Sequence, residues 1–139
     1  MELQERTMAF PADPAALAGV RDFARQAAGD LGAHVDLDLL AVVVGELAAN
    51  ATMHQSGAAR ITVRRLPGGQ LEVEVCDEDP ALPELVHQDP WALGGHRGIQ
   101  LVAALAEAWG VEPLDGHKRV WAQLPLLAAA PTPSTTERT

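Results

Sequence analysis

The spacing of apolar residues changes abruptly along this chain, and the change limits the folds that it can adopt. Through residues 14–54 apolar side chains recur every three or four positions, which is the period of an amphipathic helix. From Ile61 onwards they alternate with polar ones, and Pro67-Gly68-Gly69 separates two alternating runs, as in a β-hairpin. A chain that passes from helices to hairpins predicts an α+β fold, with helices packed on one face of a sheet.

Local signals place the ends of the expected elements. Asp13 followed by Pro14 is typical of a helix start, Gly32 and Gly110 are typical of helix ends, and Asp36 or Asp38 can cap the second helix. The expected order is an edge strand at 7–10, helices at 14–31 and 37–54, a hairpin at 61–75, a loop at 78–96, a helix at 98–109 and a second hairpin that turns at Asp115-Gly116. This order predicts a two-layer α/β sandwich with a mixed, mostly antiparallel sheet.

Composition and charge exclude several classes of protein. The 139 residues are enough for one domain, and the single cysteine, Cys76, excludes an internal disulfide framework and favours the cytoplasm. No apolar run is long enough for a membrane span, and residues 1–10 do not resemble a secretory signal. The net charge of −9 argues against direct, general binding of nucleic acid. We expect one domain over residues 1–127 and a disordered tail over residues 128–139.

Three polar residues follow one another at helical spacing on the second expected helix. Glu46, Asn50 and His54 stand four residues apart, so they share one stripe of that helix. A carboxylate can accept a proton from an attacking hydroxyl, and an amide carbonyl is a hard oxygen ligand for Mg²⁺ beside phosphates. The same spacing also fits an ordinary solvated helix face, and His54 alone fits a cap at the helix C-terminus.

Two further segments have the composition of ligand contacts. Asp77 ends an apolar strand at the start of a loop, where it could accept a hydrogen bond from a base amino group or serve as an ordinary turn residue. Gly94-Gly95-His96-Arg97-Gly98 precedes a helix, whose free N–H groups and dipole favour anions such as phosphate. Arg97 adds positive charge there, although glycines before a helix also occur as simple loop residues.

In this order, four segments resemble the GHKL superfamily of ATP-binding domains, and most closely the bacterial anti-sigma factor serine kinases and their stand-alone ATP-binding relatives. ELAANATMH is similar to the N-box, and VEVCDEDPALP is similar to the segment with the adenine-contacting aspartate. GGHRGIQLVAALAEAWGV looks like the second glycine box with its helix, and GHKRVWAQLPL looks like the closing strand. The resemblance covers almost all of residues 7–127 and implies a Bergerat-type ATP-binding fold.

The resemblance implies ATP and Mg²⁺ as cofactors and gives each matching residue a role. Asn50 would hold Mg²⁺, Glu46 would act as the base toward a serine or threonine hydroxyl, and Asp77 would accept from the adenine amino group. The further cofactor-binding residues would be His54, Gly95, Arg97 and Gly98, the last three in the phosphate lid. The partner would be an anti-anti-sigma (STAS-like) protein, a sigma factor, or both, and a homodimer is also allowed.

Three residues depart from the family pattern. Asp79 replaces a glycine, His96 replaces the first glycine of a Gly-x-Gly, and Arg119 stands where a small hydroxyl residue often supports the adenine aspartate. The leading hypothesis is a serine/threonine kinase that regulates transcription. The departures favour a second one, a nucleotide-responsive or nucleotide-free switch that binds its partner without phosphorylating it. A histidine-kinase catalytic fragment is a third, disfavoured because no dimerisation helix precedes the domain.

Overall fold

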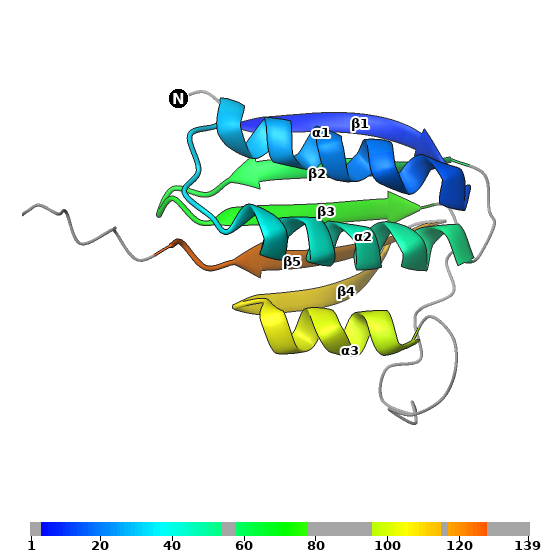
Figure 1. The fold of residues 1–139 in the computed structure, drawn as a ribbon. Helices are drawn as coiled ribbons and strands as arrows, with labels where there is room; N and C mark the ends of the chain where they lie inside the picture. Colours follow the sequence, from blue (N-terminus) through cyan, green and yellow to red (C-terminus); the bar gives the residue numbers. More distant parts are fainter. Residues whose placement is uncertain (1–3, 54–57, 78–95, 115–116, 128–139) are drawn as a thin grey trace, which may run out of the picture.

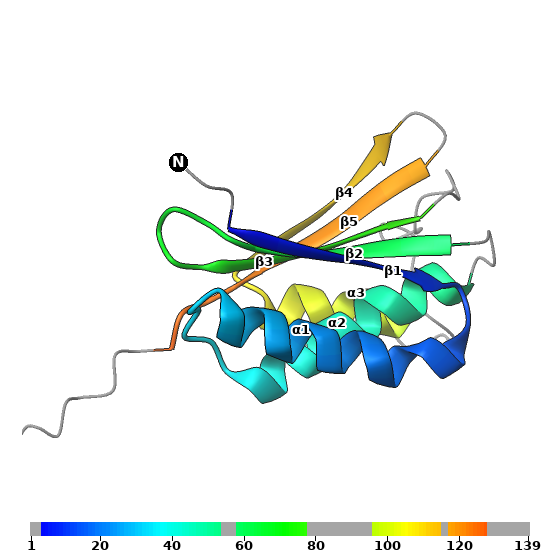
Figure 2. The same ribbon diagram turned by 90° about the horizontal axis from the view of Figure 1, so that it is seen from above.

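A computed structural model describes residues 4–53, 58–77, 96–114 and 117–127. In these residues a five-stranded sheet forms one layer, and helices cover one of its faces (Figure 1 and Figure 2). The elements are β1 (Glu5–Pro11), the 3-10 turn η1 (Pro14–Ala16), α1 (Leu17–Asp30), α2 (Leu37–Met53), β2 (Ala58–Arg65), β3 (Leu71–Asp77), α3 (His96–Leu105), β4 (Ala108–Leu114) and β5 (His117–Leu124). The predicted α+β sandwich is therefore confirmed.

The strand order of the sheet is β1-β2-β3-β5-β4, and each described pairing is antiparallel. β1 lies at one edge, as predicted, and β4 lies at the other. Although β5 comes last in the chain, it lies between β3 and β4. The last residue of β3, Asp77, therefore pairs with Lys118 near the start of β5.

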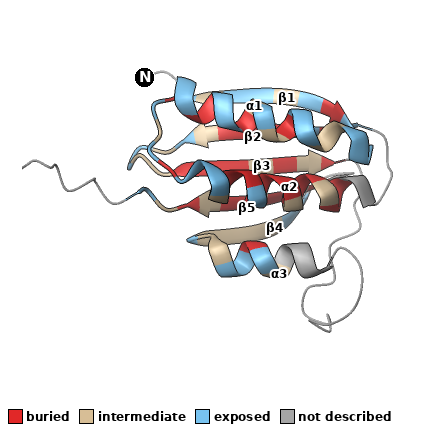
Figure 3. Ribbon diagram, in the orientation of Figure 1, coloured by how far each residue is buried: buried red, intermediate tan, exposed pale blue. Residues whose placement is uncertain are grey.

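The hydrophobic core fills the space between the sheet and the helices. Alternate residues of the central strands point toward the helices. The sides of α1 and α2 that face the sheet contribute apolar residues to the same core (Figure 3). The fully buried side chains include Val20, Leu40, Val43, Val44, Leu47, Ile61, Val63, Leu71, Val73 and Leu124. Among the described residues no helix covers the opposite face of the sheet (Figure 2), where the strands carry polar residues such as Thr62, Arg64 and Glu74.

Two aspartates begin the helical segments by capping free backbone N–H groups. The side chain of Asp13 accepts a hydrogen bond of 2.9 Å from the backbone of Ala15, which confirms the predicted cap. The side chain of Asp36 accepts from the backbone N–H groups of Asp38 at 2.9 Å and of Leu39 at 3.1 Å. Asp36, rather than Asp38, is therefore the cap of α2.

Two glycines adopt the positive φ angles that their positions require. Gly32, with φ of 70°, follows α1 and confirms the predicted helix end, where the N–H of Ala33 donates to the carbonyl of Ala28 at 3.0 Å. Gly69, with φ of 95°, lies in the turn between β2 and β3. The first predicted hairpin is therefore present, with strands a few residues longer than the alternation indicates.

The predicted third helix is wrong at both ends. α3 begins at His96 and ends at Leu105, and Trp109 and Gly110 belong to β4 instead of ending the helix. Trp109 pairs with Ala122 of β5 and packs against the core. The strand pairing therefore overrides the glycine stop signal, because it partly buries the indole of Trp109 and satisfies the backbone at the same time.

Gly110 has a packing role in β4. It lies directly opposite Trp121 of β5, and a Cβ atom placed on it would come within 2.7 Å of the indole Cζ2. We expect Gly110→Ala to lower the free energy of unfolding by about 1–3 kcal/mol, because the ring must move. Urea denaturation would measure the change.

A second glycine provides the control for this substitution. A Cβ on Gly29 of α1 would meet no atom within 4 Å, so Gly29→Ala should stabilise the protein by about 0.5–1 kcal/mol. In a Trp121→Ala background, Gly110→Ala should lose most of its cost. An equal cost with and without the indole would contradict this explanation.

Candidate functional site

Four elements bring their ends together at one end of the molecule. These are the C-terminal ends of α2 and β3, the N-terminal end of α3 and the start of β5 (Figure 1). Asn50, Asp77 and Lys118 come from three of these ends, and all three are buried. Buried polar side chains at the ends of several elements are typical of a ligand-binding site.

Asn50 lies in the last turn of α2 and has unused hydrogen-bonding capacity. The residue is 6% exposed, and its Nδ2 atom is buried without a hydrogen-bond partner among the described residues. Leaving such a group unpaired costs about 1–3 kcal/mol, which a bound ligand can recover. The amide can present either its N–H donors or its carbonyl oxygen after a flip. The site therefore fits a phosphate oxygen or a hard cation such as Mg²⁺.

Glu46 lies one helical turn before Asn50 on α2 and is half-buried. No hydrogen bond or ion pair joins its carboxylate to another residue in the described part of the chain. It lines a cavity of about 330 Å³ between α1 and α2, together with Arg21 and Arg25. The guanidinium of Arg21 lies over Gly45, where a Cβ would be 3.2 Å from its Nε atom. The Glu46 carboxylate is therefore available to a proton donor that enters this cavity.

Asp77 and Lys118 form a buried ion pair across β3 and β5. The ammonium nitrogen of Lys118 lies 3.2 Å from Oδ1 and 3.2 Å from Oδ2 of Asp77. The Lys118 side chain is fully buried, and that of Asp77 is 4% exposed. The attraction between the two buried charges offsets the loss of their hydration, so the pair holds the Asp77 carboxylate in a fixed position.

The residue opposite Asp77 differs from the one that the sequence predicts. Arg119 pairs with Cys76 and points to the uncovered face of the sheet, whereas Lys118 pairs with Asp77 on the helix-covered face. The correction follows from the alternation of side chains along a strand. Val120 and Ala122 face the core, so counting back by two from Val120 gives Lys118, and this signal was present in the sequence.

The remaining predicted site residues lie at or beyond the start of α3. Arg97 and Gly98 belong to its first turn, so their backbone is placed at the same end of the sheet as Asp77 (Figure 1). The N-terminus of a helix of this length can bind an anion. His54 and Gly95 lie outside the described residues, as does the segment 78–95.

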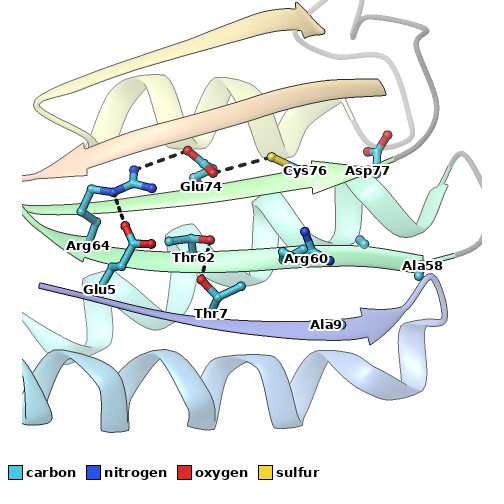
Figure 4. A pocket seen from close by; sticks show the side chains of 11 residues that line it. Glu5, Thr7, Ala9, Ala58, Arg60, Thr62, Arg64, Glu74, Cys76 and Asp77 are labelled. Carbon is cyan, nitrogen blue, oxygen red and sulfur yellow. Dashed lines mark hydrogen bonds and ion pairs between the residues drawn. The ribbon is translucent and has the colours of Figure 1, made fainter. Parts of the chain in front are cut away.

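The uncovered face of the sheet carries a second hollow, of about 580 Å³, lined by residues of β1, β2 and β3 (Figure 4). Most of its charged side chains pair with neighbours on the same face, although Arg60 has no ion pair among the described residues. Arg64 contacts Glu5 at 2.9 Å and Glu72 at 2.7 Å, and Arg119 contacts Glu72 at 3.0 Å. Asp77 also lines one end of this hollow, and we place the candidate ligand site at that end of the sheet, away from the paired charges.

Cys76 and Glu74, which lie on this face, both have shifted pKa values. Burial raises the pKa of the Cys76 thiol to about 11, and the adjacent Glu74 carboxylate adds to the shift. Burial also tends to raise the pKa of Glu74, but the hydrogen bond and charge of Arg119, with the charge of Arg64, leave it below its ordinary value. Cys76 therefore stays a protonated thiol at neutral pH, which excludes it as a nucleophile under these conditions.

None of the helices in the described ranges is long and apolar enough to cross a membrane.

Comparisons with known proteins identify the family and the fold of the chain. The family model of the histidine kinase-like ATPase domain matches residues 10–124. No curated protein matches the chain. A crystal structure of the RsbU and RsbW domains of Rv1364c from Mycobacterium tuberculosis has a similar fold, with a TM-score of 0.58 and 17% sequence identity. That match covers 88% of this chain and 32% of the other one. The family match spans the helices, the strands and the candidate site, and the chain therefore belongs to the histidine kinase-like ATPase domain family.

Proposed function

We propose that this protein is an ATP- and Mg²⁺-binding regulator that resembles anti-sigma factor kinases and transfers the γ-phosphate of ATP to a serine or threonine of a partner protein. The family match supports ATPase chemistry, and the similar structure includes an RsbW domain. The observation that carries the proposal is the buried Nδ2 atom of Asn50 at the end of α2, which has no hydrogen-bond partner among the described residues. The partner that we propose is an anti-anti-sigma (STAS-like) protein, with a sigma factor as a second ligand.

Each residue at this end of the sheet has a task in the proposed reaction. Asn50 would hold Mg²⁺, which when bound supplies positive charge beside the phosphates. Asp77 would accept a hydrogen bond from the adenine amino group, and the start of α3, with Arg97 and Gly98, would face the phosphates. His54 and Gly95 complete the proposed set of nucleotide contacts.

Glu46 would take the proton from the attacking hydroxyl. Its carboxylate is unpaired among the described residues, and it lines a cavity large enough for a side chain of a partner. A base positioned within hydrogen-bond reach of the hydroxyl accelerates its attack and orients it toward the phosphorus. In this scheme Arg21 and Arg25 surround the entry of the partner segment with positive charge.

One observation favours a second function, a switch that binds its partner without phosphorylating it. The Asp77 carboxylate already contacts the ammonium of Lys118 with both oxygens. Binding of a base at Asp77 must then compete with this ion pair, which weakens the nucleotide affinity. The two functions differ in whether ATP bound with Mg²⁺ loses its γ-phosphate to the partner.

Titration calorimetry with Asn50 variants tests the magnesium role. With Mg²⁺ present, Asn50→Ala should weaken ATP binding by about tenfold to a hundredfold, whereas in EDTA the same substitution should change little. Asn50→Asp retains an oxygen ligand and is the matched control, so it should keep most of the magnesium-dependent affinity. Full affinity of Asn50→Ala in the presence of Mg²⁺ would remove Asn50 from the metal site.

A further inference from the structure

The Asp77–Lys118 pair places a hydrogen-bond donor beside an acceptor where the base is proposed to bind. The ammonium nitrogen is 3.2 Å from each carboxylate oxygen, and neither side chain is exposed to water. The next residue, Arg119, cannot replace Lys118 because it points to the other face of the sheet and contacts Glu72, Glu74 and Glu112. A base that reaches Asp77 therefore meets both a negative and a positive group.

The two purines differ at the edge that would face this pair. Adenine presents an amino group at position 6 beside an acceptor nitrogen, and guanine presents a carbonyl oxygen there beside an N–H donor. A lone carboxylate held opposite position 6 accepts from the adenine amino group and repels the guanine carbonyl, so in that position it favours adenine over guanine. An ammonium beside the carboxylate removes this exclusion, because it can donate to the guanine carbonyl while the carboxylate accepts from the ring N–H.

We propose that Lys118 is a specificity-determining residue that relaxes base selection, so that the site accepts guanine as well as adenine nucleotides. The inference rests on the proposed function, which places the base of the nucleotide at Asp77. Lys118 brings a full positive charge into a buried region, where its interaction with a carbonyl oxygen is stronger than at the surface. Hydrogen bonds to charged groups are also about twice as strong as neutral ones.

Calorimetric titrations of the wild-type chain with ATP and with GTP, each with Mg²⁺, test this inference. We expect the two dissociation constants to agree within about threefold. This difference in binding free energy is smaller than the contribution of one hydrogen bond. In Lys118→Met, which keeps an unbranched stem of similar length, GTP should bind about tenfold to a hundredfold more weakly than ATP. A wild-type preference for ATP of a hundredfold or more would overturn the inference.

Two further variants control for charge and folding. Arg119→Met removes a cation one residue away on the opposite face of the sheet, so it should leave the ratio of ATP to GTP affinity unchanged. Lys118→Arg keeps the cation and should continue to bind both nucleotides. If thermal unfolding shows that Lys118→Met does not fold, the wild-type ratio and the Lys118→Arg ratio still decide the question.

The outcomes also separate this inference from the proposed function. If the wild-type chain binds ATP and rejects GTP, the inference fails and the proposed function stands. If it binds neither nucleotide, both fail. If Arg119→Met changes the ratio as much as Lys118→Met does, the effect arises from total charge, and the assignment to Lys118 is overturned.

Discussion

Replacing Asp77 with asparagine should lower the free energy of unfolding by about 3–5 kcal/mol, because it removes the negative charge that the buried ammonium of Lys118 contacts. The substitution hardly changes the shape of the side chain, so packing contributes little to the loss. Lys118 has no exposed surface at all, and water cannot easily solvate it after the change. Urea denaturation at neutral pH measures the effect.

Two controls identify the cause of this loss. Glu112 also pairs with an arginine, at 2.8 Å, but its side chain is 55% exposed, so Glu112→Gln should cost less than about 1 kcal/mol. The double variant Asp77→Leu with Lys118→Met replaces both charges by apolar groups, and it should be more stable than Asp77→Asn. Equal costs for Asp77→Asn and Glu112→Gln would show that the buried pair contributes no more than a surface pair.

The second large effect concerns the proposed base. Glu46→Gln should slow phosphoryl transfer to a partner serine or threonine by about 10²- to 10⁴-fold, because an amide cannot accept the hydroxyl proton. ATP affinity should stay unchanged, since Glu46 lines the cavity between α1 and α2 instead of the base-binding end. Labelled ATP, Mg²⁺ and candidate STAS-like proteins provide the assay.

The matched control lies on the same helix. Asp38 is an exposed acidic residue in the first turn of α2, far from the proposed reaction, and Asp38→Asn should transfer phosphate at the wild-type rate. Equal transfer by Glu46→Gln and the wild-type chain would remove Glu46 from its role. ATP binding without transfer to any partner, in the wild-type chain as well, would instead support the non-catalytic switch.

Features of the fold that depend on neighbours in the sequence could be predicted well. Asp13, Asp36 and Gly32 act within a few residues of themselves, so their types and positions already contain the necessary information. The ends of α3 could not be found in this way. Trp109 joins β4 because it pairs with Ala122 of β5, and that pairing is not visible in the residues beside Trp109.

In the candidate site, too, features set by sequence neighbours could be predicted, and features set by tertiary contacts could not. Spacing alone predicts that Glu46 and Asn50 share one helix, but the lack of a partner for Asn50 Nδ2 among the described residues depends on how α2 packs in the folded protein. The family pattern assigns to Arg119 the position beside Asp77 that Lys118 holds, and this difference of one residue changes the face of the sheet. The roles of His54 and Gly95, which lie outside the described residues, stay predictions, as do the domain limits at 1–127 and the cytoplasmic location.

The charged network on the uncovered face also has a consequence for folding. Arg119 of β5 contacts Glu72 and Glu74 of β3, residues that precede it by 47 and 45 positions in the chain. If β5 docked one residue out of register, Arg119 would turn toward the apolar core and leave these carboxylates without their cation. The network therefore disfavours structures in which β5 is shifted by one residue. The central strands have one register in which both the charged and the apolar residues find partners.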